Sequence, residues 1–386
     1  MGAPPHPADR AGVTGGDAAP LTEILRRQIA QSGPLTVAEY MAAALGHPVH
    51  GYYTTRDPLG RAGDFTTSPE ISQVFGELIG LWCADLWLRA GRPAPLRLVE
   101  LGPGRGTLLA DLWRAIGVVP GLREAVHLHL VETSPALRAA QAATLERAEA
   151  PPPQWHDHVA DALSAAGQGP AIVLANEFFD ALPIHQYIRS PAGWRERRVA
   201  WDEAQGGFAF GLDPAPSAGL VEVPEALRAA PPGSLVEVCP LAQSLMAEAA
   251  RHVAAHGLAV LAIDYGHIQS AAGETLQALS GHAPADPLGD PGRADITAHV
   301  DFAALARAAV EAGGEVHGPI TQAGFLGRLG LAARTQALAA ARPDLAEETR
   351  AGTARLVDPA PTGMGALFKV LAVTPPGLVP AGFADG

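Results

Sequence analysis

Residues 98–107, LVELGPGRGT, place three alternate glycines between an apolar strand pattern and a helical pattern. Glycines let the backbone approach a ligand closely and adopt φ values that other residues avoid. The helix that follows such a turn directs free backbone N–H groups towards the ligand. The run therefore predicts a nucleotide-binding turn at the carboxyl end of a buried strand in an α/β fold.

The glycine spacing and the acidic residue before it narrow the choice of ligand. The spacing is G-x-G-x-G, whereas dinucleotide-binding proteins have G-x-G-x-x-G, and Glu100 lies two residues before the first glycine. A carboxylate at this place repels a diphosphate but attracts the ammonium and sulfonium of S-adenosylmethionine, which has no phosphate. The turn therefore favours S-adenosylmethionine, and a dinucleotide-dependent oxidoreductase is the disfavoured alternative.

Length, charge and composition limit the class of protein. With 386 residues the chain can bury a large core, as one α/β domain with insertions. The formal net charge of −13 argues against nucleic acid and anionic membrane surfaces as partners. No apolar run reaches the roughly 18 residues of a membrane span, and residues 1–20 have the pattern of neither a signal peptide nor a transit peptide. We therefore expect a cytoplasmic bacterial protein without membrane insertion.

The cysteines and histidines do not predict a metal site. The chain has 2 cysteines, which is too few for a disulfide framework or a thiolate zinc site. His156 and His158 form an i, i+2 pair, but no third ligand accompanies them at helical spacing.

Changes in pattern along the chain predict six segments. They are a disordered tail at 1–20, a helical N-terminal extension and lid at 21–95, a Rossmann-like core that binds S-adenosylmethionine at 96–186, an inserted antiparallel β subdomain at 187–233, the rest of the core at 234–375 with a loop insertion at 267–299, and a tail at 376–386.

The expected cofactor-binding residues follow the ends of the predicted parallel strands, where ligands of such sheets bind. Glu132, 26 residues after Gly106, is placed to accept hydrogen bonds from both ribose hydroxyls of an adenosine ligand. Asp161 is a candidate for the adenine amino group, with a capping or solvated aspartate as the alternative. The full predicted set is Glu100, Gly102, Gly104, Gly106, Glu132, Asp161, Ala162, Asn176, Thr66 and Thr67.

Two carboxylates after the buried strand at 171–175 are the predicted catalytic residues. Glu177 and Asp180 are suited to a guanidinium nucleophile, because paired carboxylates fix its plane by charge-assisted hydrogen bonds. The alternative is that Asp180 caps a helix while Glu177 faces solvent. Asp264, Tyr265 and His267 follow a later strand and are expected to contact the substrate, with a strand-end turn as their alternative.

Five motifs in order resemble the MidA family of class I S-adenosylmethionine-dependent methyltransferases. They are GYY at 51–53, GDFTTSPEIS at 63–72, ELGPGRG at 100–106, ANEFFDALP at 175–183 and IDYG at 263–266, and the resemblance spans about 21–373. The family includes the mitochondrial protein arginine methyltransferase that acts in respiratory complex I assembly. The resemblance implies a seven-stranded Rossmann-like sheet, a helical N-terminal extension and an inserted subdomain that faces the substrate.

The function that the resemblance implies is protein arginine N-methylation, with a respiratory complex I subunit or a similar protein as substrate and S-adenosylmethionine as cofactor. Two alternatives are a methyltransferase for small molecules, which needs a closed apolar acceptor pocket, and a non-catalytic assembly factor that keeps the cofactor pocket. The sequence predicts no oligomeric state.

Overall fold

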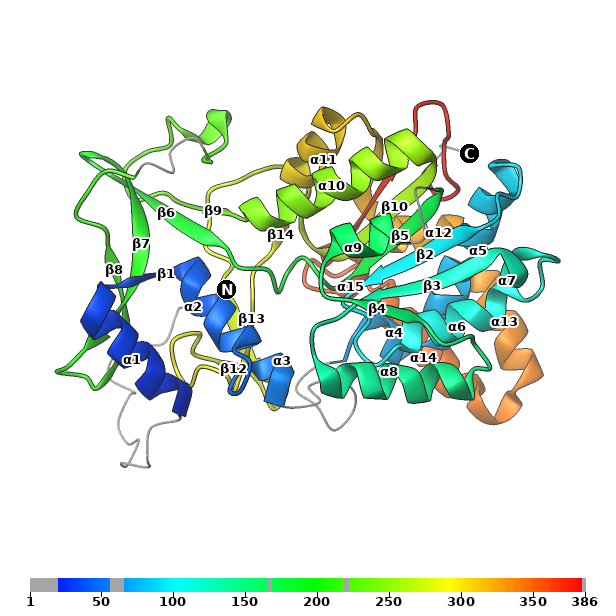
Figure 1. The fold of residues 1–386 in the computed structure, drawn as a ribbon, viewed down its shortest axis with the longest axis horizontal. Coiled ribbons are helices and arrows are strands. Elements are labelled where there is room, and N and C mark those ends of the chain that lie inside the picture. Colours follow the sequence, from blue (N-terminus) through cyan, green and yellow to red (C-terminus); the bar gives the residue numbers. More distant parts are fainter. Residues whose placement is uncertain (1–19, 56–65, 166–168, 218–221, 384–386) are drawn as a thin grey trace.

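A large mixed sheet forms the centre of the computed structural model, which describes residues 20–55, 66–165, 169–217 and 222–383 (Figure 1). Its strands lie in the order β15 (Glu315–Thr321), β16 (Phe368–Thr374), β10 (Leu258–His267), β5 (Ala171–Asn176), β2 (Leu96–Leu101), β3 (Val126–Val131) and β4 (Gln154–His156), and β14 (Val300–Asp301) pairs with the end of β10. The strands from β10 to β4 are parallel, and β16 is antiparallel to both of its neighbours. The predicted Rossmann-like sheet is therefore confirmed.

Helices cover both faces of this sheet, because its central strands are apolar on both sides. In β2, Leu96 and Leu98 pack with α5 (Gln73–Arg89) and α6 (Thr107–Ile116), whereas Val99 and Leu101 pack with the opposite layer. That layer contains α9 (Val159–Ser164), α10 (Pro240–His256) and α11 (Phe302–Glu311). Further helices are α7 (Leu122–Ala125), α8 (Pro135–Arg147), α12 (Gln322–Arg328), α13 (Leu331–Ala341), α14 (Ala346–Leu356) and α15 (Met364–Leu367). The sheet is thus buried on both faces, as its continuous apolar strands require.

A second lobe lies beside the large sheet and is built from three segments that are distant in sequence (Figure 1). The first contains α1 (Pro20–Ser32), β1 (Leu35–Thr36), α2 (Val37–Gly46) and α3 (Tyr52–Thr55). The second contains β6 (His185–Ser190), β7 (Gly193–Asp202), β8 (Gly207–Leu212) and β9 (Leu235–Val238), and the third contains β11 (Gln277–Ser280), β12 (Ala283–Ala285) and β13 (Asp295–Thr297). Leu21, Met41, Val199 and Ile296 share one apolar cluster, so the three segments form a common core.

Strands β6, β7 and β8 form an antiparallel sheet where the inserted β subdomain is expected. In this sheet β9 pairs with β6, and β1 from the N-terminal extension pairs with β7, so that it has five strands. Two parts of the chain differ from the expected organisation. The segment 267–299, expected as a loop, forms strands β11 to β13, which are too short for a visible alternation of polar and apolar residues. Helix α5, expected in the extension and lid, packs on α6 under the large sheet.

The tail predicted at 1–20 lies outside the described residues except for Pro20. None of the helices in the described part of the chain is long and apolar enough to cross a membrane.

Candidate functional site

Two neighbouring cavities lie at the carboxyl ends of the central parallel strands. The first cavity, of about 300 Å³, is lined by residues that follow β2, β3 and β5, together with Tyr53 from α3. The second cavity, of about 470 Å³, lies towards the second lobe and is lined from β10, β11, β13 and the C-terminal helices. Tyr53 and Glu177 line both cavities, so the two spaces meet at these side chains.

The glycine-rich turn lines the first cavity in the conformation that its sequence predicts. Gly102, Gly104 and Gly106 have φ values of 59°, 55° and 81°, in the left-handed region that other residues rarely adopt. Gly102 and Gly104 face the cavity, whereas Gly106 is the N-cap of α6 and does not line it. A Cβ atom on Gly102 would lie 2.9 Å from Cδ2 of Phe178, another residue of the cavity wall.

Two acceptor oxygens in this wall have no hydrogen-bond partner. Glu100 at the end of β2 is 3% exposed, and burial raises its pKa to about 8. Its Oε2 and the Oδ1 of Asn176 are buried without a partner. Buried acceptors of this kind need a donor, and beside a carboxyl a cationic N–H donor is favoured most. The first cavity therefore fits a ligand with an ammonium group.

Glu132 lines the same cavity and is held from two sides. Its Oε1 accepts the backbone N–H of Ser134 at 2.8 Å, and its Oε2 accepts Nε2 of Gln141 at 3.2 Å. Gln141 also donates to the carbonyl of Gly104 at 2.8 Å, which joins the glycine turn to Glu132. Burial raises the pKa of Glu132. Gln141 was missed by the sequence analysis, since a buried glutamine in a helix carries no distinguishing pattern.

The short helix α4 (Ser68–Ile71) joins the two sides of the first cavity. The backbone N–H of Ser68 donates to Oε1 of Glu177 at 2.7 Å, and the hydroxyl of Thr107 at the start of α6 donates to Glu70. Of the two threonines predicted to bind the cofactor, Thr67 lines the first cavity and Thr66 lines the second. The part of the predicted lid at 56–65 lies outside the described residues.

Glu177 occupies the junction of the cavities in an unusual backbone conformation. Its φ is 50°, and its N–H donates to the carbonyl of Ile263 at 2.8 Å. Its Oε1 also accepts Nδ2 of Asn176 at 3.2 Å. Burial, assisted by the nearby Asp180, raises the pKa of Glu177 to about 7. A non-glycine residue held in this region costs conformational energy and is typical of functional sites.

The second cavity is lined by two carboxyl groups that each accept a phenolic O–H. Oδ2 of Asp180 accepts the hydroxyl of Tyr265 at 2.5 Å, and Oδ1 of Asp295 accepts that of Tyr53 at 2.8 Å. Burial raises the pKa of Asp180 to about 6, and its Oδ1 is buried without a partner. Together with Glu177, these groups make the second cavity acidic. Tyr53 and Asp295 were not predicted as site residues.

Besides Gly106, four of the predicted residues line neither cavity. Asp264 is fully buried, and its Oδ2 accepts the backbone N–H groups of residues 178, 179 and 180 at 3.1, 2.9 and 3.3 Å, so it shapes the turn that carries Glu177 and Asp180. His267 ends β10 outside both walls. Asp161 is exposed in the first turn of α9, and Ala162 is buried in the core behind it.

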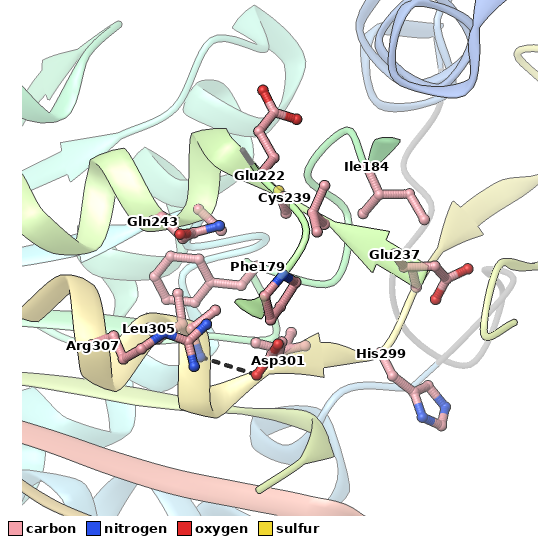
Figure 2. A pocket seen from close by; sticks show the side chains of 16 residues that line it. Phe179, Ile184, Glu222, Glu237, Cys239, Gln243, His299, Asp301, Leu305 and Arg307 are labelled. Carbon is pink, nitrogen blue, oxygen red and sulfur yellow. Dashed lines mark hydrogen bonds between the residues drawn. The ribbon is translucent and has the colours of Figure 1, made fainter. Parts of the chain in front are cut away.

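Figure 2 shows a third cavity, lined by Phe179, Cys239 and Leu305 among others. Its volume of about 40 Å³ leaves room for only a few water molecules. In the described residues, no group of three or more His, Cys, Asp and Glu side chains is arranged to hold a metal ion.

A family model and curated proteins match more than half of the chain. A family model described as an S-adenosyl-L-methionine-dependent methyltransferase matches residues 78–320. The chain is 40% identical over 340 residues to "Protein arginine methyltransferase NDUFAF7, mitochondrial" of Danio rerio, covering 81% of this chain and 77% of that protein. It is 36% identical over 387 residues to the Homo sapiens protein of the same name, covering 92% of this chain and 84% of that protein.

Solved structures agree with these relatives. A Burkholderia thailandensis protein crystallised with S-adenosyl-homocysteine superposes with a TM-score of 0.83 at 28% identity, covering 97% of this chain and 98% of that one. A native crystal structure from the same organism gives a TM-score of 0.77 at 28% identity, with coverage of 97% and 96%.

These findings correct one prediction and confirm another. The predicted bacterial cytoplasmic location is wrong, because the curated relatives are named as mitochondrial proteins. The resemblance of the sequence motifs to a methyltransferase family is confirmed. The chain belongs to this family of S-adenosyl-L-methionine-dependent methyltransferases, and S-adenosyl-L-methionine is its cofactor.

Proposed function

We propose that this enzyme methylates arginine side chains of a protein, with a respiratory complex I subunit or a similar protein as substrate. The observation that carries the proposal is the acidic second cavity, which meets the first cavity at Glu177. A closed apolar pocket would instead suit a small-molecule acceptor. The names of the curated relatives support an arginine acceptor.

In this proposal the first cavity holds the methyl donor through the predicted residues that line it. The unpartnered oxygens of Glu100 and Asn176 receive the donor's ammonium, and Glu132 receives its ribose hydroxyls. Gly102 and Gly104 allow the close approach of the backbone, and Thr67 lines the same cavity. S-adenosyl-L-methionine supplies, when bound, a methyl group activated by its sulfonium.

Glu177 and Asp180 bind and orient the acceptor. Their carboxylates hold the plane of a guanidinium by charge-assisted hydrogen bonds, so that one nitrogen faces the first cavity. Methylation of this nitrogen forms a C–N bond, breaks the C–S bond of the donor and releases one proton from the guanidinium. Glu177, whose pKa burial raises to about 7, accepts this proton near neutral pH.

The proposal is tested by incubating the purified enzyme with methyl-labelled donor and a mitochondrial or bacterial protein extract, followed by mass spectrometry of the labelled proteins. We expect the label on arginine. Label found only in small molecules would contradict the proposal, and so would binding of protein without any transfer, which is expected of a non-catalytic assembly factor.

Binding of S-adenosyl-homocysteine is expected to release about one proton near pH 7. Burial raises the pKa of Glu100 to about 8, so most of the free enzyme carries a neutral carboxyl at pH 7. The ligand's ammonium stabilises the carboxylate and lowers this pKa in the complex. The complex therefore binds fewer protons than the free enzyme, so affinity rises with pH and levels off above about 8.

Calorimetric titration in two buffers of different ionisation enthalpy measures this proton release. The Glu100→Gln variant, which cannot ionise, should bind without it. Equal proton release by the variant and the wild type would show that Glu100 does not receive the ammonium.

A further inference from the structure

The second cavity is flanked by carboxyl groups from both lobes. Asp180 and its partner Tyr265 belong to the turn after β5 and to β10 of the large sheet. Asp295 and its partner Tyr53 belong to β13 and α3 of the second lobe. Each tyrosine donates its hydroxyl to one carboxyl oxygen, which fixes the orientation of that carboxyl group.

The backbone holds these two acidic elements against each other. The N–H of Ala298, directly after β13, donates to the carbonyl of Asp180 at 3.0 Å. Asp295 is 5% exposed and Asp180 is 7% exposed. The position of Asp295 relative to Asp180 is therefore fixed by the fold and does not depend on an exposed loop.

The carboxyl groups that line this cavity favour binding of a cation with several N–H donors. Three carboxyl groups line it, those of Glu177, Asp180 and Asp295. Oδ1 of Asp180 is buried without a partner. Buried carboxylates are costly unless a cation and hydrogen bonds compensate them.

Lysine and arginine differ in how they can meet this need. An ammonium presents three donors from one atom, whereas a guanidinium presents five N–H donors in a rigid plane along more than one edge. Carboxylates on one wall of a cavity can bind either cation. Carboxylates on two opposite lobes can both accept hydrogen bonds from one guanidinium, because this planar group carries N–H donors on more than one edge.

We propose that Asp295, oriented by the hydroxyl of Tyr53, selects a guanidinium over an ammonium as the acceptor. The inference rests on the proposed arginine methylation and adds the residue that sets its specificity. Asp295 binds the edge of the guanidinium that faces the second lobe, while Glu177 and Asp180 bind the edges that face the large sheet.

The test measures steady-state kinetics of the full chain with an arginine peptide that the wild type methylates and with the same peptide carrying lysine. Asp295→Asn should raise KM for the arginine peptide on the order of 10- to 100-fold, with a smaller change in kcat, since one charge-assisted contact is lost. Its preference for arginine over lysine should fall by a similar factor. Tyr53→Phe keeps the carboxylate and should give the same pattern at about tenfold or less.

Asp290→Asn is the matched control, because Asp290 is an exposed aspartate of the same insertion that lines neither cavity. It should leave KM unchanged, and calorimetry with S-adenosyl-homocysteine should show unchanged donor affinity in Asp295→Asn and Asp290→Asn. One outcome is that the wild type methylates arginine while Asp295→Asn and Tyr53→Phe both have the wild-type KM and the wild-type preference for arginine. In that case the role of Asp295 in selecting a guanidinium is refuted and the proposed function stands. The same holds if the variants lose only thermal stability. If the wild type methylates no arginine, the proposed function itself fails.

Discussion

Glu177→Gln is expected to lower kcat for methyl transfer on the order of 100- to 10,000-fold, the usual range for loss of a general base. The substituted amide keeps the size of the side chain, and its oxygen can still accept the Ser68 N–H that holds the position now. It has no charge to fix the guanidinium and cannot take up the released proton. The measurement is single-turnover transfer of labelled methyl to the arginine acceptor at saturating donor.

The pH dependence of the same reaction separates this role from a structural one. Because the pKa of Glu177 is raised to about 7, its carboxylate form is the minor species below that pH. The wild-type kcat/KM should therefore rise with pH up to about 7 and then level off, as expected when the free enzyme needs an ionised base. In Glu177→Gln this rise should be absent.

Donor affinity and a matched variant serve as controls for this prediction. Glu146→Gln changes an exposed glutamate on α8 that lines neither cavity and should leave the rate unchanged. Glu177→Gln should bind S-adenosyl-homocysteine close to normally, since Glu100 and Glu132 are intact. If Glu177→Gln transferred the methyl group at the wild-type rate, Glu177 would not be the base of the reaction.

Most of the wall of the first cavity, where we propose that the donor binds, could be predicted from sequence because its signals are local. An apolar strand, a terminal carboxylate and alternate glycines lie within 98–107, and backbone geometry alone places them at one edge of the sheet. Glu132 follows from the same rule applied to the next strand. The fold class was predictable for the same reason, since strand and helix patterns alternate along the core.

The second cavity could not be predicted to this extent, because its residues are brought together by contacts between distant parts of the chain. Tyr53 and Asp295 are separated by 242 positions, and neither stands in a motif whose spacing indicates the other. The strand that carries Asp295 has three residues, which is too short to show a period. The sequence therefore predicts the carboxylates of one lobe and misses their counterpart in the other.

The alternation of side chains along a strand separates the roles of Asp264 and Tyr265, and this could have been read from the sequence. Consecutive residues of a strand point to opposite faces, so only one of the two could face the acceptor. In the structure Tyr265 lines the second cavity, while Asp264 accepts backbone N–H groups of the turn at 178–180. The buried carboxylate of Asp264 thus stabilises this turn, and the turn positions Glu177 and Asp180.

Gly102→Val is expected to weaken binding of S-adenosyl-homocysteine by at least about 100-fold, since small displacements in a closely fitted site have effects of this size. The φ of 59° is unfavourable for any side chain, most of all a β-branched one, and the new Cβ would lie 2.9 Å from Phe178. Phe178 must then shift, and it forms part of the wall of the first cavity, where we propose that the donor binds. The affinity is measured by calorimetry and the stability by thermal unfolding.

Gly206→Val separates backbone strain from damage to the site. Gly206 has a φ of 65° in the turn between β7 and β8, and a Cβ atom there meets nothing within 4 Å. Both variants should lose about 1–3 kcal/mol of folding free energy through the strained conformation, but only Gly102→Val should lose the donor. Equal donor affinity in the two variants would mean that the ligand does not approach the backbone at Gly102. The close contact between ligand and backbone that the alternate glycines predict would then be expected at Gly104.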